Sequence, residues 1–147
     1  MKTWIKRIGL VLLIIAAVVF WGRWLLDLFG IVKYALPLNQ DVENIVQIEL
    51  LENTDSELTV LCTLTDHEMD AFLQEFMQIE AGRYANDPPT QLGKRAVKVY
   101  YSDGGYDILG QDMIIFFSAS GEILPTNGWY YLPIDALDSL FEKYVKI

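Results

Sequence analysis

The hydrophobic pattern separates an apolar N-terminal segment from a remainder in which apolar and polar positions alternate. The basic start MKTWIKR is followed by an unbroken apolar run over residues 8–20. Trp21, Trp24 and further leucines extend the hydrophobicity, so residues 4–26 supply the roughly 20 apolar positions that a membrane-spanning helix needs. We expect this helix to run on to near Ala35, because Pro37 cannot continue it.

The same order of basic and apolar residues is also found in signal peptides. Cleavage needs small residues at the first and third positions before the cut, and a cut after Gly22 would place Phe20 in the third. Retention as an anchor is therefore expected, with a cleaved signal peptide and a buried helix of a soluble protein as the alternatives. Basic residues are more numerous before the span than after it, which predicts a single pass through the cell membrane with a cytoplasmic N-terminus and the C-terminal domain outside.

After the anchor, apolar residues recur at every second position, as they do in half-buried strands. Residues 45–52 and 58–64 alternate in this way on either side of the turn cluster NTDS, which predicts a β-hairpin. Leu58, Val60 and Cys62 share a face of the second strand that we expect to point inward. Further strands are expected over residues 96–101, 106–109, 113–119 and 129–132. The third of these is nearly all apolar, so we expect it to be central.

Two segments change to helical spacing. Thr65 and Glu68 form a capping box before an amphipathic helix that we expect to end at Gly82. Pro133 fits the first turn of a closing helix with an apolar stripe. Between Gly82 and Gly93 the sequence GRYANDPPTQLG is typical of a long loop.

The resulting order of elements, β-β-α-β-β-β-β-α, predicts an α+β fold. We expect an N-terminal transmembrane helix followed by a mainly antiparallel sheet with two helices packed on one face. The expected organisation is a cytoplasmic stub and anchor helix in residues 1–36, a linker in 37–44 and an extracytoplasmic α+β domain in 45–147. About 110 residues are enough for a single hydrophobic core.

Charge is divided unevenly between these parts. The sequence from Ala35 onward holds nineteen of the twenty Asp and Glu residues but only six of the eleven Lys and Arg residues. Such an acidic domain repels nucleic acid and anionic lipid headgroups, so we expect neither as its partner. Because the chain has one cysteine, it cannot form an internal disulfide.

Residue types that carry catalysis or bind metals are sparse. The one histidine, His67, lies in the first turn of an expected helix and faces solvent, so we expect no catalytic residue and no cofactor. No metal-binding motif occurs. Asp103, Asp107 and Asp112 cluster around one hairpin, SDGGYDILGQD, and are the candidates that the sequence offers for a Ca²⁺ site. Asp and Gly are also favoured there by the turn itself.

Polar-tipped aromatic side chains indicate a binding surface. They lie on expected strands or beside the proline-containing loop, where rings with one polar end can line a groove for a peptide or a glycan. Half-burial in the sheet is the alternative interpretation. The binding candidates are Tyr84, Tyr106, Trp129 and Tyr130.

The segments TLTDHEMDAFLQEF and VKVYYSDGGYDI combine a strand that runs into a capped helix with a tyrosine-rich hairpin closed by Asp-Gly. In this they resemble small uncharacterised, membrane-anchored extracytoplasmic domains of Gram-positive bacteria. The resemblance covers about half of the chain. It implies no activity, and no residue's role is carried over from it.

Together these features predict a single-pass membrane-anchored binding or sensing module rather than an enzyme. Its expected partners are the membrane and a protein or cell-surface polymer. Two alternatives stay open, an accessory subunit of a membrane complex and a carboxylate-dependent cell-surface hydrolase. An exposed apolar patch on the sheet would favour the first, and two facing buried carboxylates in a cleft would favour the second.

Overall fold

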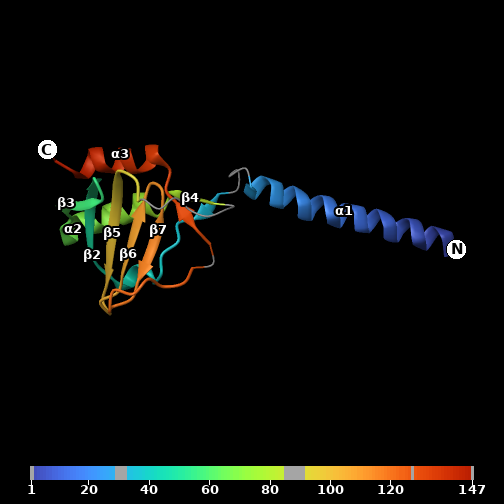
Figure 1. Cartoon of the computed structure of the whole chain (residues 1–147), viewed down its shortest axis with the longest axis horizontal. Coiled ribbons are helices and arrows are strands. Elements are labelled where there is room, and N and C mark those ends of the chain that lie inside the picture. Colours follow the sequence, from blue (N-terminus) through green and yellow to red (C-terminus); the bar gives the residue numbers. More distant parts are fainter. Residues whose placement is uncertain (1, 29–32, 85–91, 127, 147) are drawn as a thin grey trace.

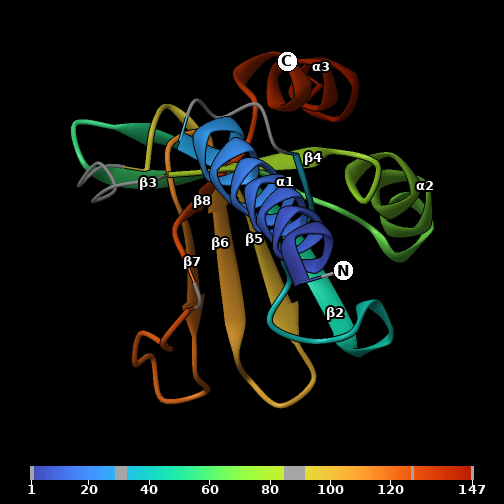
Figure 2. The ribbon, with the colours of Figure 1, turned by 90° about the vertical axis from the view of Figure 1, so that its right-hand side faces the viewer.

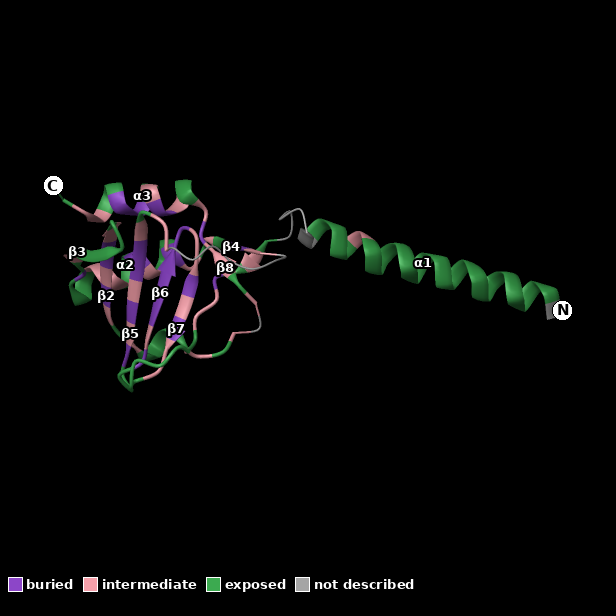
Figure 3. Ribbon diagram, viewed as in Figure 1, coloured by how far each residue is buried: buried purple, intermediate pink, exposed green. Residues whose placement is uncertain are grey.

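The protein consists of one long N-terminal helix and a folded domain (Figure 1). The computed structural model describes residues 2–28, 33–84, 92–126 and 128–146. Helix α1 (Lys2–Leu28) contains the apolar segment Thr3–Leu26, in which no residue is buried against the rest of the described chain (Figure 3). By length and composition this helix can cross a membrane or serve as a signal sequence.

The predicted continuation of this helix to Ala35 is wrong. α1 ends at Leu28, residues 29–32 lie outside the described part, and Tyr34–Ala35 form strand β1. β1 pairs with β4 (Glu80–Arg83), a pairing across more than forty residues that helical spacing cannot reveal. Leu36 follows in the hydrophobic core, so the folded domain begins before the predicted linker.

The domain is built on a five-stranded antiparallel sheet with the strand order β3-β2-β5-β6-β7. Its strands are β2 (Ile45–Thr54), β3 (Glu57–Thr63), β5 (Arg95–Tyr101), β6 (Tyr106–Gly110) and β7 (Ile114–Phe117). A short 3₁₀ helix, η1 (Val42–Asn44), precedes β2. A three-stranded sheet, named here the small sheet, has the order β1-β4-β8, where β8 is Tyr130–Tyr131. Two helices, α2 (Asp66–Phe76) and α3 (Ile134–Tyr144), complete the α+β fold, which is confirmed.

Both helices pack on one face of the five-stranded sheet, as predicted. Phe72 and Phe76 of α2 and Leu137 of α3 are fully buried in one core with Val97 and Val99 of β5. Figure 2, which looks along the molecule with α1 toward the viewer, places both helices to the upper right of the strands. The opposite face carries a smaller buried cluster of Leu51, Ala96 and Ile108.

Strand β7 lies at an edge of the sheet, and the prediction that it is central is wrong. β5 occupies the middle position instead. The apolar run has a different cause, because both faces of β7 are covered. Ile114 and Phe116 belong to the helix-side core, while Phe117 on the other face stacks on Tyr106 with ring centroids 4.7 Å apart.

Helix α2 ends at Phe76, well before its predicted end at Gly82. Residues 80–83 form β4, which pairs with β8, so the predicted loop begins as a strand. Residues 85–91 of that loop lie outside the described part. Gly82 permits the pairing because a Cβ at this position would overlap the ring of Tyr131.

Edge strand β3 does not have the predicted inward face. A register shift between β2 and β3 leaves Leu61 as an extra residue opposite the continuous strand β2. Such a bulge displaces the alternation of side chains by one residue. Cys62 therefore stays on the helix side, whereas Leu58 and Val60 lie on the open face and are 38% and 49% exposed. The predicted burial of these two residues is wrong.

The Cys62 thiol is half-buried at the margin of the core, and burial, followed by the charge of Glu68, raises its pKa. A raised pKa leaves less of the reactive thiolate at neutral pH. We expect a maleimide to modify Cys62 several-fold more slowly in the native protein than in urea, as followed by intact mass. Equal rates in the two conditions would contradict this placement of the side chain.

Candidate functional site

Aromatic side chains gather on the small sheet. Tyr34 of β1 meets Tyr130 of β8 edge to face, with ring centroids 5.7 Å apart and planes at 76°. The Arg83 guanidinium lies 5.9 Å from the Tyr130 ring centroid, a distance at which a cation is attracted to the ring face. β1 and β8 both pair with the central strand β4, which explains why residues far apart in sequence meet here.

A second pair lies on the opposite face of the small sheet, because Tyr131 follows Tyr130 in β8 and successive strand residues point to opposite faces. The rings of Tyr84 and Tyr131 lie 4.7 Å apart, and the Tyr84 hydroxyl donates a hydrogen bond of 2.8 Å to the Asp112 carbonyl oxygen. Burial raises the pKa of Tyr84, and the nearby Asp112 charge acts in the same direction. Tyr84 is therefore held by its hydroxyl while one side of its ring packs against a neighbour.

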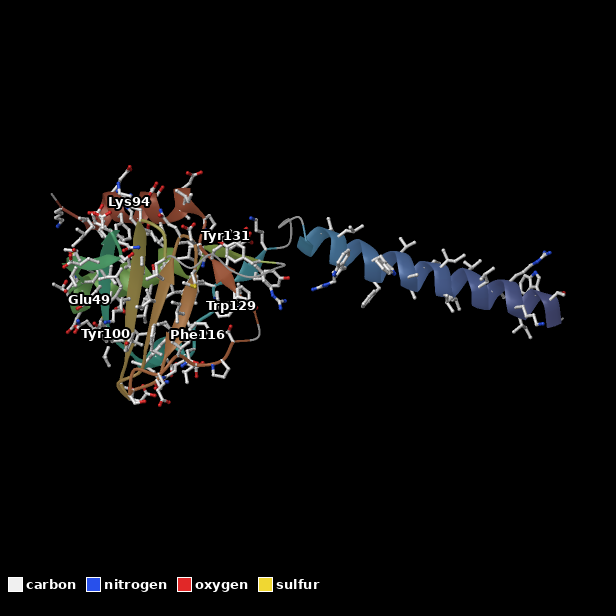
Figure 4. The ribbon with its side chains drawn as sticks, in the orientation of Figure 1. Glu49, Lys94, Tyr100, Phe116, Trp129 and Tyr131 are labelled. Carbon is white, nitrogen blue, oxygen red and sulfur yellow. The ribbon has the colours of Figure 1, made fainter. Side chains whose placement is uncertain are left out.

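Trp129 is the most exposed aromatic residue of this region. Its carbonyl oxygen accepts a hydrogen bond from the Tyr84 backbone N–H at 2.9 Å, while its side chain is 41% exposed. Figure 4 shows Trp129 and Tyr131 on the side of the domain that faces α1. We name this group the small-sheet aromatic cluster. It comprises Tyr34, Arg83, Tyr84, Trp129, Tyr130 and Tyr131.

The sequence-based candidates are thus only partly brought together. Tyr130 belongs to the small sheet, and Tyr84 and Trp129 directly flank its strands β4 and β8. Tyr106, in contrast, lies on the open face of the five-stranded sheet. There the Lys98 ammonium sits 4.6 and 4.5 Å from the rings of Tyr100 and Tyr106. The structure does not bring Tyr106 together with the other three, because β6 and β8 belong to different sheets.

Sequence reasoning missed Tyr34 and Arg83. Tyr34 was assigned to the end of the anchor helix, and Arg83 to a loop. The short segments that contain these two residues have a polar and aromatic composition, which was the available signal. Strands of two and four residues are, however, too short to show a periodic pattern.

The three aspartates of the hairpin do not form a common site. Asp103 serves the turn, since its Oδ1 accepts the Gly105 backbone N–H at 2.8 Å and its Oδ2 accepts the Gln40 side-chain amide at 2.8 Å. Asp112 lies beside Gly93 at the other end of β6. In the part of the chain that the structure describes, no three His, Cys, Asp or Glu side chains are grouped closely enough to hold a metal ion.

Asp107, by contrast, is completely buried on the helix side of β6. Its Oδ2 accepts the Tyr101 hydroxyl and, at 2.8 Å, the backbone N–H of Asn39, whereas Oδ1 has no hydrogen-bond partner among the described residues. Burial raises the pKa of Asp107 to about 6, against the opposing effect of the two donors. Burial and then the neighbouring carboxyl strongly raise the pKa of Tyr101.

This carboxyl connects the chain that follows α1 to the sheet. Asn39 and Gln40 both hydrogen-bond to the β5–β6 region, one to Asp107 and the other to Asp103. Together with Leu36 in the core, these contacts fix the segment predicted to be a linker. Sequence reasoning placed Asp107 on an expected strand of the hairpin, among the candidates for a Ca²⁺ site, and missed this role.

A hollow of about 380 Å³ opens between the β3 end of the sheet and α3. The Arg95 guanidinium lies over the Phe141 ring at 5.2 Å and donates a hydrogen bond of 2.7 Å to Asp138. Two carboxylates, Glu52 and Glu142, also line the hollow. The other lining residues are Leu61 and Val145.

Comparisons with protein-family models, curated proteins and solved structures find no match for this chain. The resemblance to small anchored extracytoplasmic domains therefore stays a prediction, and functional proposals rest on the geometry.

Proposed function

We propose that this protein is a single-pass membrane-anchored binding or sensing module with a cytoplasmic N-terminus and an extracytoplasmic domain. The domain recognises a protein or a cell-surface polymer through the small-sheet aromatic cluster. Rings with a polar tip, together with an arginine, are the side chains that most often dominate the binding energy of protein interfaces. Such rings can also pack against the apolar faces of sugars, while their polar tips hydrogen-bond to sugar hydroxyls.

The observation that carries this proposal is the position of Tyr34. It belongs to the aromatic cluster, and it is also among the first residues after α1 to join the domain. Leu36 and Asn39, which follow it, are fixed in the core and to Asp107. A ligand that moves the ring of Tyr34 therefore acts on the segment that leads to the anchor, and this supports a sensing role as well as a binding role.

The accessory-subunit alternative is favoured by a separate observation. Leu58 and Val60 of β3 are 38% and 49% exposed, and they form a small apolar patch on the open face of the sheet. The hydrolase alternative lacks its expected support in the described residues, where Asp107 is the only buried carboxylate and its partner is a tyrosine hydroxyl. We propose no catalytic role.

Photo-crosslinking from the native membrane tests the aromatic cluster. A benzoylphenylalanine replacing Trp129 should give a defined adduct with a cell-surface component, because this side chain is exposed within the cluster. Adding Tyr84→Ala should reduce the adduct by about tenfold, the scale expected when a packed interface aromatic is truncated. Adduct mass and yield are read after affinity purification.

The matched control carries the same photo-reactive residue at Ile123, which is 65% exposed but lies on the loop after β7. Equal yields from the two positions, or an adduct that is indifferent to Tyr84→Ala, would remove the aromatic cluster as the binding surface.

A further inference from the structure

Strand β3 forms an edge of the five-stranded sheet that the described residues leave uncovered. Its sequence ELTVLCT is exposed at every position except Cys62, which is half-buried. Three of its apolar side chains contribute to this surface, with exposed fractions of 38% for Leu58, 49% for Val60 and 39% for Leu61. Soluble proteins usually protect such edges with lysine, proline or a covering segment, because an open strand recruits another strand. β3 contains neither lysine nor proline, and its bulge at Leu61 leaves residues 57–60 paired in regular register with β2, with their other edge open.

The opposite edge of the sheet is protected. The chain after β7 folds back along it, so that the Leu124 N–H donates to the Phe116 carbonyl at 2.8 Å and the Ser118 N–H donates to the Glu122 carbonyl at 2.9 Å. Phe117 and Ile123 also form a β-bridge. Of the two edges, only β3 has no covering segment in the part of the chain that the structure describes.

The surroundings of β3 select the charge of a partner. Glu49 and Glu52 lie on the neighbouring strand β2, Glu57 begins β3, and Glu142 lines the hollow beside Leu61. Two basic side chains offset part of this charge, because Lys94 lies 4.0 Å from Glu52 and Arg95 also lines the hollow. The domain as a whole has far more acidic than basic residues. A segment with lysine or arginine is therefore attracted, whereas a second copy of this acidic domain is repelled.

The location of β3 also fits a partner outside the anchor region. Figure 1 shows β3 at the end of the sheet away from β4 and the connection to α1. The bulge at Leu61 turns its side chain toward the hollow, while Leu58 and Val60 face the other side. An added strand would thus find apolar contacts on both faces of the edge.

We propose that the β3 edge binds an extended cationic segment of a partner protein, which adds as a sixth strand to the sheet. Backbone hydrogen bonds to β3 supply affinity, alternate apolar side chains cover Leu58 and Val60, and the basic side chains are attracted by the net negative charge of the domain. This site is separate from the small-sheet aromatic cluster, and Tyr84→Ala leaves it unchanged.

Fluorescence anisotropy with the full-length protein in nanodiscs tests the proposal. The probe is a labelled synthetic peptide in which lysine and valine alternate, and we expect saturable binding. Val60→Lys should weaken it by about tenfold or more, because the new charge repels the peptide and a lysine on an edge strand opposes pairing with another strand. Ile123→Lys, the same change at an exposed apolar residue on the protected edge, should leave it within about twofold, as expected for a rim charge.

Two further probes separate strand addition from plain charge attraction. The same peptide with alternate backbone amides N-methylated keeps its charge but cannot pair along one edge, and it should bind about tenfold more weakly. A peptide with glutamate in place of lysine should not bind. If Val60→Lys fails to give a cooperative melt, Leu58→Lys replaces it.

Absence of saturable binding by the lysine–valine peptide would overturn the proposal. So would equal binding of the N-methylated peptide, or equal weakening by Val60→Lys and Ile123→Lys. Concentration-dependent dimerisation of the wild-type protein that disappears in Val60→Lys would assign the edge to a second copy instead.

Discussion

Replacing Asp107 with asparagine should remove a pH-dependent loss of stability from the domain. The wild-type carboxyl has a pKa of about 6 when folded, against an ordinary value near 3.8. This difference corresponds to a free energy of unfolding that is lower by about 3 kcal/mol when the group is ionised. Asparagine has no charge to bury, so the variant should lack this dependence.

The sign follows from proton binding. Between the ordinary and the raised pKa, the folded protein holds a proton on Asp107 that the unfolded chain has released, so stability falls as the pH rises. About 2 kcal/mol of the loss falls between pH 4.5 and 7.5. Glu68 and Glu75 act in the opposite direction, because hydrogen bonds from Thr65 and Lys143 lower their pKa values. Their effect develops below this pH window.

Urea unfolding of the full-length protein in nanodiscs at the two pH values measures the difference. Asp103→Asn is the matched control, since it makes the same chemical change at an exposed side chain in the neighbouring turn and should keep the wild-type difference. Tyr101→Phe removes a donor to the charged carboxylate and should move the window to higher pH. If the wild-type protein were equally stable at the two pH values, folding would not raise the pKa of Asp107, and the prediction would be wrong.

The consequence for the proposed function lies in the segment that follows α1. The Asn39 N–H binds the ionised Oδ2 of Asp107 more strongly than it would bind a neutral carboxyl. Ionisation therefore tightens this contact while it weakens the fold as a whole. A sensing role through the anchor connection would make use of such a balance, because the contact sits between Tyr34 and the sheet.

The sequence predicted the elements whose periodicity extends over several residues. Alternation identified β2, β5 and β6, and the capping box identified the start of α2, where the Thr65 N–H and hydroxyl both donate to Glu68 Oε2. The small sheet was missed because its three short strands are defined by pairing across long separations. Only tertiary contact makes these segments strands.

The candidate site was predicted in part for the same reason. Trp129 and Tyr130 were placed on a strand, and Tyr84 beside it, but the sheet to which the strand belongs could not be read from the chain. Asp107 was recoverable, since strict alternation along YDIL puts it on the same face as Leu109, which is fully buried. The clustering of Asp103, Asp107 and Asp112 around one hairpin directed attention to a shared site instead. The bulge at Leu61 has no comparable signal, because one extra residue in a strand leaves the composition unchanged.

Phe72→Ala should be the most damaging single truncation in the domain. Phe72 is completely buried, and its ring lies 5.1 Å from that of Phe76 and 5.2 Å from that of Tyr144, which it meets edge to face. It therefore joins α2 to α3 above the sheet. Truncating a buried phenylalanine costs about 3–5 kcal/mol, because the lost transfer free energy is increased by the cavity left behind.

A loss of this size removes a large share of the roughly 5–15 kcal/mol that stabilises an ordinary domain. We expect the urea midpoint of the full-length protein, followed by circular dichroism in nanodiscs, to fall sharply or the cooperative transition to disappear. Helix α1 contributes a constant signal, since none of its apolar segment packs on the domain. Ile134→Ala, at a position 57% exposed on α3, is the matched control and should change stability by about 0.5 kcal/mol or less. Similar small effects from both variants would mean that α2 and α3 do not share a packed core, and the face of the sheet that carries Asp107 would then be open to solvent.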